Sequence, residues 1–187
     1  MNAVILLFLA DGFEEIEALT PVDVLRRAGE DVMTVAVGTG DSRTVTGSHG
    51  ISVTADITSA DAAKLAGKAD AVILPGGMPG AKNLDADGTV DALLTDAYNR
   101  GATLAAICAA PMIPGKRGML AGRRATCFPG FEKDLIDAHF TGGRVETDGN
   151  VITACGMGAA TEFALAIVSK MKGERAAKEM QSSILAR

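Results

Sequence analysis

Short apolar runs alternate along the chain with segments whose apolar residues recur every three or four positions. A continuous apolar run of about four to eight residues, bounded by polar residues or glycine, is typical of a strand buried in a parallel sheet. On this basis we predict strands at residues 3–9, 31–37, 69–74, 102–107, 144–147 and 151–154, with a further short strand at 124–127.

The segments with helical spacing predict helices at residues 14–28, 60–66, 89–99, 132–138, 159–171 and 174–184. The first of them contains Thr20-Pro21, a pair that suits the N-cap and first turn of a helix. We therefore expect that helix either to start late or to bend at this point. A short helix broken by Pro114, Gly115 and Gly118 is expected after the strand at 102–107.

This alternation predicts an α/β fold with a mainly parallel sheet and helices on both of its faces. Residues 43–45 and 51–55, on either side of the turn at 47–50, predict a small β-hairpin. The chain has 187 residues without a linker, repeat or low-complexity stretch, so we expect a single domain over residues 1–187.

Cys108 is the sharpest chemical feature of the sequence. It follows the strand at 102–107 and lies among small residues, in Ala105-Ala106-Ile107-Cys108-Ala109-Ala110-Pro111. Such residues permit a tight strand–turn–helix that exposes the sulfur as a nucleophile elbow does. The positive end of the following helix would favour the thiolate. The alternative is a small buried hydrophobic residue, which is a common role of a free cysteine.

Glu14, Glu15 and Glu17 follow the first strand, and ligands of open parallel sheets bind beyond the carboxyl ends of the strands. Acidic residues in the first turn of a helix often only complement the helix dipole, which suffices for Glu14 or Glu15. Glu17 is placed relative to the apolar stripe so that it can turn inward. A buried carboxyl group near a thiolate has a raised pKa, stays protonated, and can donate to the sulfur and shuttle protons on a substrate.

Gly76-Gly77 follows the predicted strand at 69–74 and should lie at the same carboxyl end of the sheet. The backbone N–H groups of this pair could hold a developing oxyanion, although a plain tight turn explains the pair equally well. The glycines at 156 and 158 match neither the Rossmann fingerprint nor a P-loop, so nucleotide binding is not expected. His49 and His139 are candidate bases for a Cys–His pair, and each also fits a turn or surface position.

Composition excludes several classes of function. The net charge of −5 argues against nucleic acid as a main partner, because phosphate binding needs a basic face. Cys108, Cys127 and Cys155 with two histidines give neither a disulfide framework nor a zinc ligand set, and we expect no metal and no cofactor. The apolar run at 3–10 is too short to span a bilayer and lacks the basic start of a signal peptide. We therefore expect a cytoplasmic protein without membrane association.

Several motifs together resemble the ThiJ/PfpI superfamily, and within it the Parkinson-associated deglycase branch. The resemblance covers nearly the whole chain, and the motifs are specific in combination rather than singly. They are, in order, Glu14-Glu15-Ile16-Glu17, the segment from Pro21 to Gly29, Leu74-Pro75-Gly76-Gly77, the segment from Ala105 to Pro111, and Thr161-Glu162-Phe163-Ala164-Leu165.

The resemblance implies a flavodoxin-like three-layer sandwich, of the class I glutamine amidotransferase type, that forms a homodimer. It implies that Cys108 is the reactive cysteine, Glu17 its protonated partner, and the backbones of Gly77 and Ala109 the oxyanion donors. Members of this family are described as cofactor-independent glyoxalases that convert methylglyoxal to lactate, and glyoxal to glycolate. Many are also described as deglycases of early glycation adducts, and others as oxidative-stress sensors or chaperones.

Two positions depart from the best-known relatives. Those relatives carry His-Pro where this chain has Phe128-Pro129, so a direct Cys–His pair is not expected here. They often carry Arg where this chain has His49, which weakens an anion pocket formed with Arg27 across the dimer, or makes it dependent on pH. Glu14 and Gly76 complete the residues expected to line the substrate or dimer pocket.

The expected partner is thus a small reactive dicarbonyl compound or a glycated adduct, attacked by the Cys108 thiolate. The alternatives use the same cysteine differently. A redox sensor or redox-regulated chaperone would rely on oxidation of Cys108, and a chaperone also needs an exposed apolar patch. A cysteine peptidase or amidase would need a histidine near Cys108, and Ala109 directly after the cysteine argues against proteolysis.

Overall fold

One sheet of seven strands forms the centre of the computed structural model, which describes residues 3–186. Its strands are β1 (Val4–Ala10), β2 (Asp31–Val37), β5 (Ile57–Thr58), β6 (Ala71–Leu74), β7 (Thr103–Ile107), β10 (Val145–Asp148) and β11 (Val151–Ala154). They lie in the order β10-β11-β7-β6-β1-β2-β5. Only β10 is antiparallel to its neighbour, so the predicted mainly parallel sheet is confirmed.

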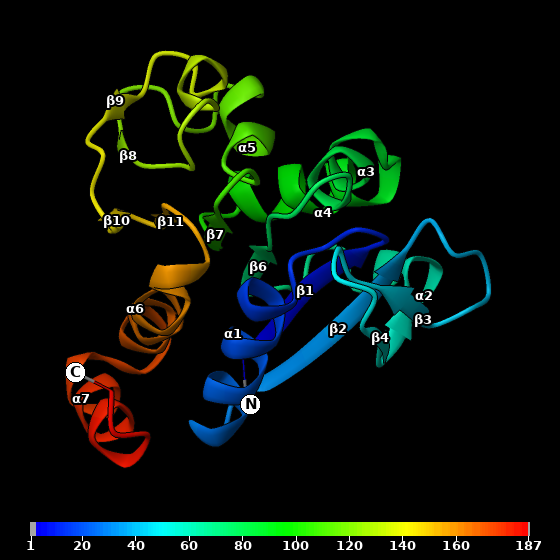
Figure 1. Ribbon diagram of the computed structural model, residues 1–187, viewed down its shortest axis with the longest axis horizontal. Coiled ribbons are helices and arrows are strands. Elements are labelled where there is room, and N and C mark those ends of the chain that lie inside the picture. The colour runs from blue at the N-terminus through cyan, green and yellow to red at the C-terminus, as the bar shows by residue number, and fades with distance from the viewer. Residues whose placement is uncertain (1–2, 187) are drawn as a thin grey trace.

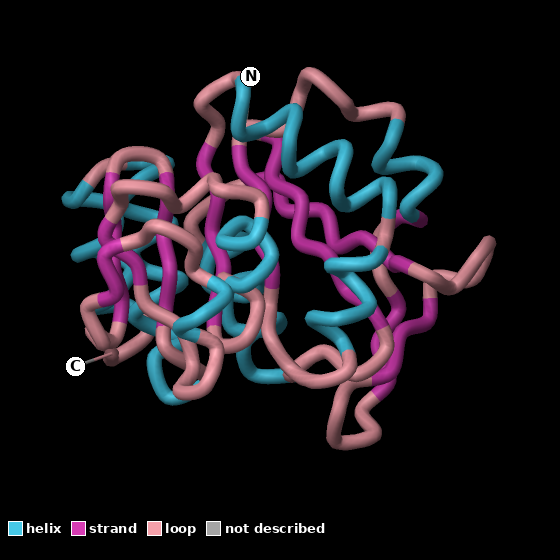
Figure 2. The backbone as a smooth tube through the Cα atoms, turned by 90° about the horizontal axis from the view of Figure 1, so that it is seen from above, coloured by secondary structure: helices cyan, strands magenta, loops and turns pink. Residues whose placement is uncertain are grey.

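Helices cover both faces of this sheet. They are α1 (Glu15–Arg27), α2 (Ser59–Ala63), α3 (Gly80–Ala86), α4 (Gly88–Asn99), α5 (Met112–Lys116), α6 (Ala160–Lys172) and α7 (Glu174–Ser183). Figure 1 shows α1, α6 and α7 together on one side, and α2, α3 and α4 together on the other. In Figure 2 the strands pass between these helices, which gives the three layers of an α/β sandwich.

Two hydrophobic cores follow from the alternation of side chains along each strand. Leu6 and Phe8 of β1 face the core shared with α4, whereas Ile5, Leu7 and Leu9 face the core shared with α1 and α6. All five side chains are buried, which explains why β1 reads as a continuous apolar run.

Two small sheets and two 3₁₀ turns complete the chain. The predicted hairpin is confirmed as β3 (Thr44–Thr46) paired with β4 (Ser52–Thr54). The strand expected at 124–127 is the short β8 (Arg124–Ala125), which pairs with β9 (His139–Phe140). The 3₁₀ turns are η1 (Glu132–Asp134) and η2 (Met157–Ala159).

One helix prediction is wrong: the helix expected at 132–138 is only the single turn η1, because Asp137 adopts a left-handed backbone with φ of 57° that no helix continues through. The helix predicted at 14–28 is confirmed as α1. Of the two alternatives at Thr20-Pro21 the late start is wrong, because α1 begins at Glu15 and keeps Pro21 inside it as a buried residue. The side chain of Glu14 caps this helix by accepting a hydrogen bond from the Glu17 N–H.

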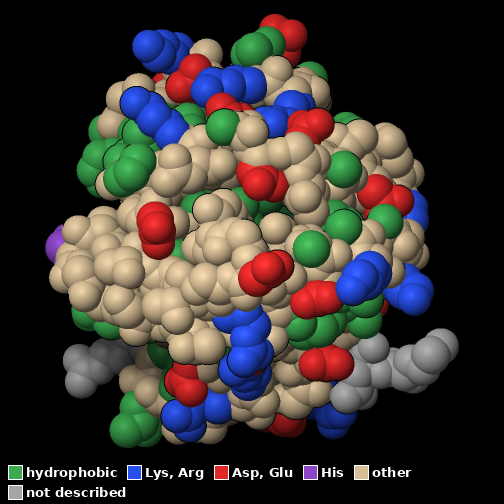
Figure 3. All heavy atoms as spheres, turned by 90° about the vertical axis from the view of Figure 1, so that its right-hand side faces the viewer, with side chains coloured by type: hydrophobic (Ala, Val, Ile, Leu, Met, Phe, Trp, Pro, Cys, Tyr) green, Lys and Arg blue, Asp and Glu red, His purple; other side chains and the backbone are tan. Residues whose placement is uncertain are grey.

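The surface carries mixed charge. On the face shown in Figure 3, Lys and Arg side chains lie among Asp and Glu side chains. Within residues 3–186, no helix has both the length and the apolar character needed to cross a bilayer.

Candidate active site

Cys108 lies directly after β7, and its backbone is held in a strained conformation. Its φ of 65° is in the left-handed region, which costs a residue other than glycine about 1–3 kcal/mol. Two hydrogen bonds fix this geometry: the Cys108 N–H donates to the Ala154 carbonyl (2.8 Å), and the Cys108 carbonyl accepts from the Phe128 N–H (2.8 Å). The turn predicted to present the sulfur is therefore present, and residues from two other segments maintain it.

Glu17 reaches this turn from the first turn of α1. It shares the buried stripe of that helix with Pro21 and Val24, and only 1% of its surface is exposed. Its Oε2 accepts a hydrogen bond from the Gly76 N–H (3.0 Å), and its carboxyl group is close enough to the Cys108 thiol to form a hydrogen bond with it. The predicted inward orientation of Glu17 is therefore what the structure shows.

Gly76 lies between the two reactive side chains. A Cβ atom at this position would lie 2.6 Å from Oε2 of Glu17 and 2.7 Å from Cβ of Cys108. Both distances are shorter than van der Waals contact allows, so only glycine lets the carboxyl group and the thiol approach each other. Gly77 follows with φ of 88°, and a Cβ atom there would collide with the backbone of Glu14.

Burial raises the pKa of Glu17 to about 7, and the negative charge of Glu14 adds to this effect, whereas hydrogen bonds from Cys108, Gly76 and Met157 oppose it. Burial also raises the pKa of the Cys108 thiol to about 12, and the negative charge of an ionised Glu17 contributes in the same direction. Because two adjacent buried anions repel each other, the two groups lose their protons as a coupled pair, the second proton only after a large further rise in pH.

The raised pKa of Glu17 agrees in direction with the predicted buried carboxyl group that stays protonated. Burial of Cys108 opposes the predicted thiolate, which stays a prediction. The predicted helix dipole is weak at this position, because α5 has five residues and begins only at Met112. What does favour the thiolate is the pair of backbone N–H groups of Ala109 and Gly77, which lower the pKa of Cys108. These are the two donors that the resemblance implied for an oxyanion.

Glu14, Glu15 and His49 form a second polar cluster beside α1. Their ligand atoms lie within 4.8 Å of one another, a spacing that metal sites also show. The lone pairs are already in use: Glu15 accepts hydrogen bonds from the His49 N–H (2.7 Å) and pairs with His49 Nδ1 (2.8 Å), and Glu14 accepts from Glu17. A metal ion would have to displace these donors, so the geometry fits an ion pair that ties the hairpin to α1.

The remaining predicted residues lie elsewhere. Arg27 is at the far end of α1 from Glu17 and pairs with Asp23, so one chain does not bring it to His49, and a pocket across a dimer stays a prediction. His139 is exposed on β9. Cys127 is buried, and burial raises the pKa of its thiol to about 12, in keeping with a packed rather than a reactive cysteine.

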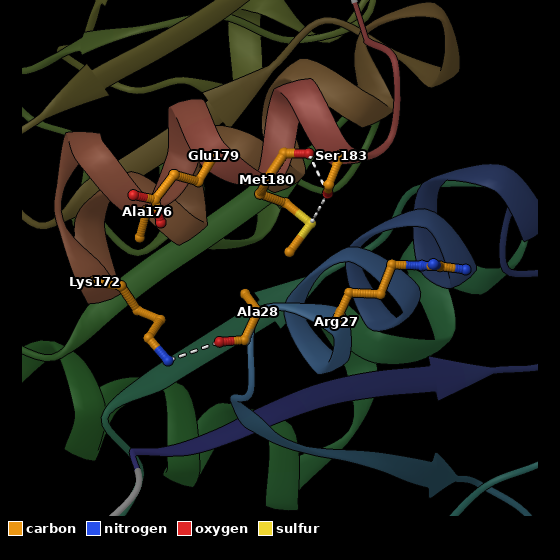
Figure 4. A pocket seen from close by; sticks show the side chains of 7 residues that line it. All are labelled: Arg27, Ala28, Lys172, Ala176, Glu179, Met180 and Ser183. Carbon is orange, nitrogen blue, oxygen red and sulfur yellow. Dashed lines mark hydrogen bonds between the residues drawn. The ribbon is translucent and has the colours of Figure 1, made fainter.

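The best-formed cavity is distant from the Cys108–Glu17 pair. It measures about 480 Å³ and lies between the end of α1 and helices α6 and α7, as Figure 4 shows. The Nζ atom of Lys172 donates to the Ala28 carbonyl at one edge of this cavity (2.7 Å). None of its lining residues belongs to the site at Cys108, so we assign the chemistry to the turn and not to this cavity.

Phe128 is a site residue that the sequence indicated only as the absence of a histidine. Its backbone N–H holds the Cys108 carbonyl, and its ring packs beside Gly156, where an added Cβ would lie 3.3 Å from the ring and 4.0 Å from Oε1 of Glu17. The residues around Phe128 form no sequence pattern that would predict these contacts, because only the tertiary fold brings the segment after β8 to Cys108.

An α/β sandwich with a cysteine in a strained turn after a central parallel strand, next to a buried carboxyl group, defines a class of proteins with a nucleophile at the strand end. Within that class, the DJ-1/PfpI family matches residues 3–170, and the chain belongs to this family. The resemblance to the ThiJ/PfpI superfamily is thereby confirmed.

Individual relatives agree with this assignment. A Parkinson disease protein 7 homolog from Danio rerio is 37% identical over 183 residues, covering 96% of this chain and 95% of that protein. A protein named deglycase from Pyrococcus abyssi is 30% identical over 152 residues, covering 80% of this chain and 88% of that protein. The structure of oxidized Toxoplasma gondii DJ-1 superposes with a TM-score of 0.92 at 32% identity, covering 98% of both chains. The flavodoxin-like fold is therefore confirmed.

Proposed function

We propose that this protein is a cofactor-independent glyoxalase that converts 2-oxoaldehydes such as methylglyoxal to 2-hydroxy acids, through Cys108 and Glu17. The observation that carries this proposal is the close approach, at Gly76, of a thiol in a strained turn and a buried carboxyl group whose pKa burial raises to about 7. A group with a pKa near the working pH serves well as both proton acceptor and proton donor.

The first step is addition of the thiol to the aldehyde. The sulfur forms a bond to the aldehyde carbon as the thiol proton passes to the Glu17 carboxylate. The N–H groups of Gly77 and Ala109 stabilise the negative charge that develops on the aldehyde oxygen. That oxygen then takes the proton from Glu17, which becomes a carboxylate again, and the product is a hemithioacetal.

The second step moves a proton between neighbouring carbons. Glu17 removes the hydrogen from the carbon that carries sulfur, which gives an enediol, and returns a proton to the adjacent former ketone carbon. One carbon is thereby oxidised to a thioester while its neighbour is reduced to an alcohol, so the electrons balance within the substrate. Water then hydrolyses the thioester, releasing lactate and restoring the thiol.

The same addition step supports a deglycase activity on early glycation adducts. Such an adduct carries a hemiaminal or hemithioacetal carbon that reverts to the aldehyde, which Cys108 can then attack. The name of the Pyrococcus abyssi relative favours this extension. Free aldehyde and adduct would use one set of residues.

The test is lactate formation from methylglyoxal by the wild-type protein and by the Cys108→Ala, Glu17→Gln and Cys127→Ala variants. We expect no lactate from Cys108→Ala and a fall of at least about 100-fold for Glu17→Gln, since general acid–base catalysis contributes that much. Cys127→Ala is the matched control, because this buried thiol should leave activity within about twofold. Substantial turnover by Cys108→Ala would refute the proposal.

The second candidate function is sensing of oxidants by the same thiol. The strained, partly exposed position of Cys108 supports it, and the related Toxoplasma gondii structure is described as oxidized. Oxidation of a thiol to sulfinic acid adds two oxygen atoms that come from peroxide. Intact-mass measurement after peroxide treatment should then show uptake at Cys108, and a sensor without glyoxalase activity would show this uptake with no lactate.

A further inference from the structure

Three residues with exposed apolar side chains, Met78, Phe128 and Met157, belong to segments whose backbone adjoins the Cys108–Glu17 pair. Their exposed fractions are 39%, 48% and 55%, although large apolar side chains are usually more deeply buried. We call these three residues the apolar rim. Exposed apolar surface next to a reactive group is available for a ligand to cover.

Each rim residue is joined to the reactive pair through the backbone. Met78 lies two residues after Gly76, where an added Cβ would lie 2.7 Å from Cβ of Cys108. Phe128 donates its N–H to the Cys108 carbonyl (2.8 Å), and Met157 directly follows Gly156, where an added Cβ would lie 4.0 Å from Oε1 of Glu17. The three residues therefore belong to segments that form this site.

The geometry of the reaction decides which part of the substrate meets the rim. The aldehyde oxygen points to the N–H groups of Gly77 and Ala109, and the neighbouring carbon must face Glu17 to exchange a proton with it. Phe128 and Glu17 flank the same residue, Gly156, since an added Cβ there would lie 3.3 Å from the ring and 4.0 Å from Oε1 of Glu17. The substituent on the carbon that Glu17 protonates therefore lies toward the Phe128 ring.

We propose that the apolar rim selects 2-oxoaldehydes that carry a bulky apolar or aromatic substituent over those that carry hydrogen or methyl. This inference rests on the proposed glyoxalase function and names its preferred substrate class. Aromatic rings attract each other in offset or edge-to-face pairs beyond the area they bury, and Phe128 offers such a face. One additional apolar contact in a site gives about 10–200-fold discrimination between substrates.

The experiment compares phenylglyoxal with methylglyoxal as substrates, measured as mandelate and lactate formation. We expect the wild-type protein to have a kcat/KM for phenylglyoxal that is at least about tenfold higher. Phe128→Ala should lower the phenylglyoxal value by about tenfold, mainly through KM, and the methylglyoxal value by less than about threefold. Phe128→Leu should restore part of the loss. Equal losses for the two substrates, or no preference in the wild-type protein, would overturn the proposal.

A matched control is Phe140→Ala, which removes a ring of similar exposure, 46%, from β9. It should leave the ratio of the two kcat/KM values unchanged. A changed ratio in Phe140→Ala would show that loss of any surface ring has this effect, and would count against the rim.

A second measurement tests aromatic recognition by the apolar rim without requiring turnover of a substrate. N-phenylmaleimide and N-ethylmaleimide both alkylate thiols, and intact mass with Cys108→Ala as the blank assigns the reaction to Cys108. Relative to free cysteine, the rim predicts a several-fold preference for the phenyl reagent that disappears in Phe128→Ala. If neither 2-oxoaldehyde is turned over but this preference holds, the glyoxalase proposal fails and the aromatic recognition stands; if the preference is absent, the rim proposal fails.

Discussion

The position of one proton decides the chemistry of Cys108 and Glu17. With Glu17 at a pKa of about 7 and Cys108 at about 12, the pair holds one proton over the intervening pH range. The two arrangements of that proton carry the same total charge, so a pH profile reports the pair and not either residue. Lactate formation should therefore rise with pH through an apparent pKa near 7, measured as kcat/KM between pH 5 and 9, and a profile that is flat over this range would contradict the shared proton.

The Glu17→Gln variant tests where the proton resides. The substitution removes a negative charge that raises the pKa of Cys108, so that pKa should fall. We expect alkylation of Cys108 by iodoacetamide at pH 9 to become faster even though turnover falls. The measurement is the rate of mass increase with Cys108→Ala as the blank. Slower alkylation of the variant would show that a protonated Glu17 stabilises the thiolate.

Gly76 gives a prediction about packing. Gly76→Ala places a methyl group 2.6 Å from Oε2 of Glu17, and overpacking of this kind costs about 1–3 kcal/mol in the free energy of unfolding. We expect lower stability in urea and a loss of lactate formation of at least about tenfold. The control is Gly88→Ala at the start of α4, where an added Cβ meets no atom within 4 Å and the substitution should stabilise by about 0.4–1 kcal/mol.

The identities of the reactive residues and the raised pKa of Glu17 were predictable, whereas the raised pKa of the Cys108 thiol was not. Cys108 follows a buried strand, and Glu17 is four positions before Pro21 on the buried stripe of α1; both facts are local in sequence. Desolvation depends on atoms brought from β6 and from the segment after β11, so the raised pKa of the thiol has no sequence signal. The role of Phe128 was missed for the same reason.

At the scale of elements, the link between α1 and the β3–β4 hairpin carries a pH dependence. Burial raises the pKa of Glu15, but hydrogen bonds from His49 outweigh it and lower that pKa to about 2. A folded-state pKa below the usual 4.5 contributes stability that is present above pH 4.5 and is lost as the pH falls toward 2. Glu15 also raises the pKa of His49 above its usual 6.5. The stability that His49 contributes to the folded chain is therefore fully present below pH 6.5 and is lost as the pH rises beyond it.

The His49→Ala variant tests this link. It removes the side-chain partner of Glu15 and should weaken the acid stability, so that unfolding begins at a higher pH than in the wild-type protein. Urea unfolding between pH 2 and 8 measures the effect, with the exposed His139→Ala as the control. The same acid midpoint in the wild-type protein and in His49→Ala would show that the hairpin is not held by this ion pair.

Long apolar elements were predicted well and short ones poorly. The strands β1, β2, β6 and β7 and the helices α1, α4 and α6 coincide with predicted segments, because burial imposes a clear period. Helix α7 also coincides with its predicted segment, although none of its residues is fully buried. The strands β5 and β9 have two residues each, which is too short to show an alternation of apolar and polar positions. Helix α3 follows Pro79 and has no side-chain cap, so the sequence carries no signal for the start of this helix. These elements depend on tertiary contacts.

At the scale of the whole molecule, α1 and the residue before β4 form a face with exposed apolar side chains. Ile16 and Ile51 are 50% and 54% exposed and line, with Leu19, an open cavity of about 440 Å³. We expect a homodimer through this face, seen by light scattering as twice the 19.1 kDa chain mass. Ile16→Glu should yield monomers, whereas Ile136→Glu, at a site of 47% exposure elsewhere, should not. A monomeric wild-type protein would refute the prediction.

The two backbone bonds at Cys108 have a consequence for how the chain matures. Because Ala154 and Phe128 lie far downstream of the cysteine, the left-handed kink cannot persist until both have docked. During synthesis, the emerging thiol should therefore titrate as an ordinary cysteine, and it should acquire its raised pKa and its place beside Glu17 only when β11 closes the sheet. The pKa of this one sulfur would then report complete folding, and a chain truncated before residue 151 would keep the ordinary value.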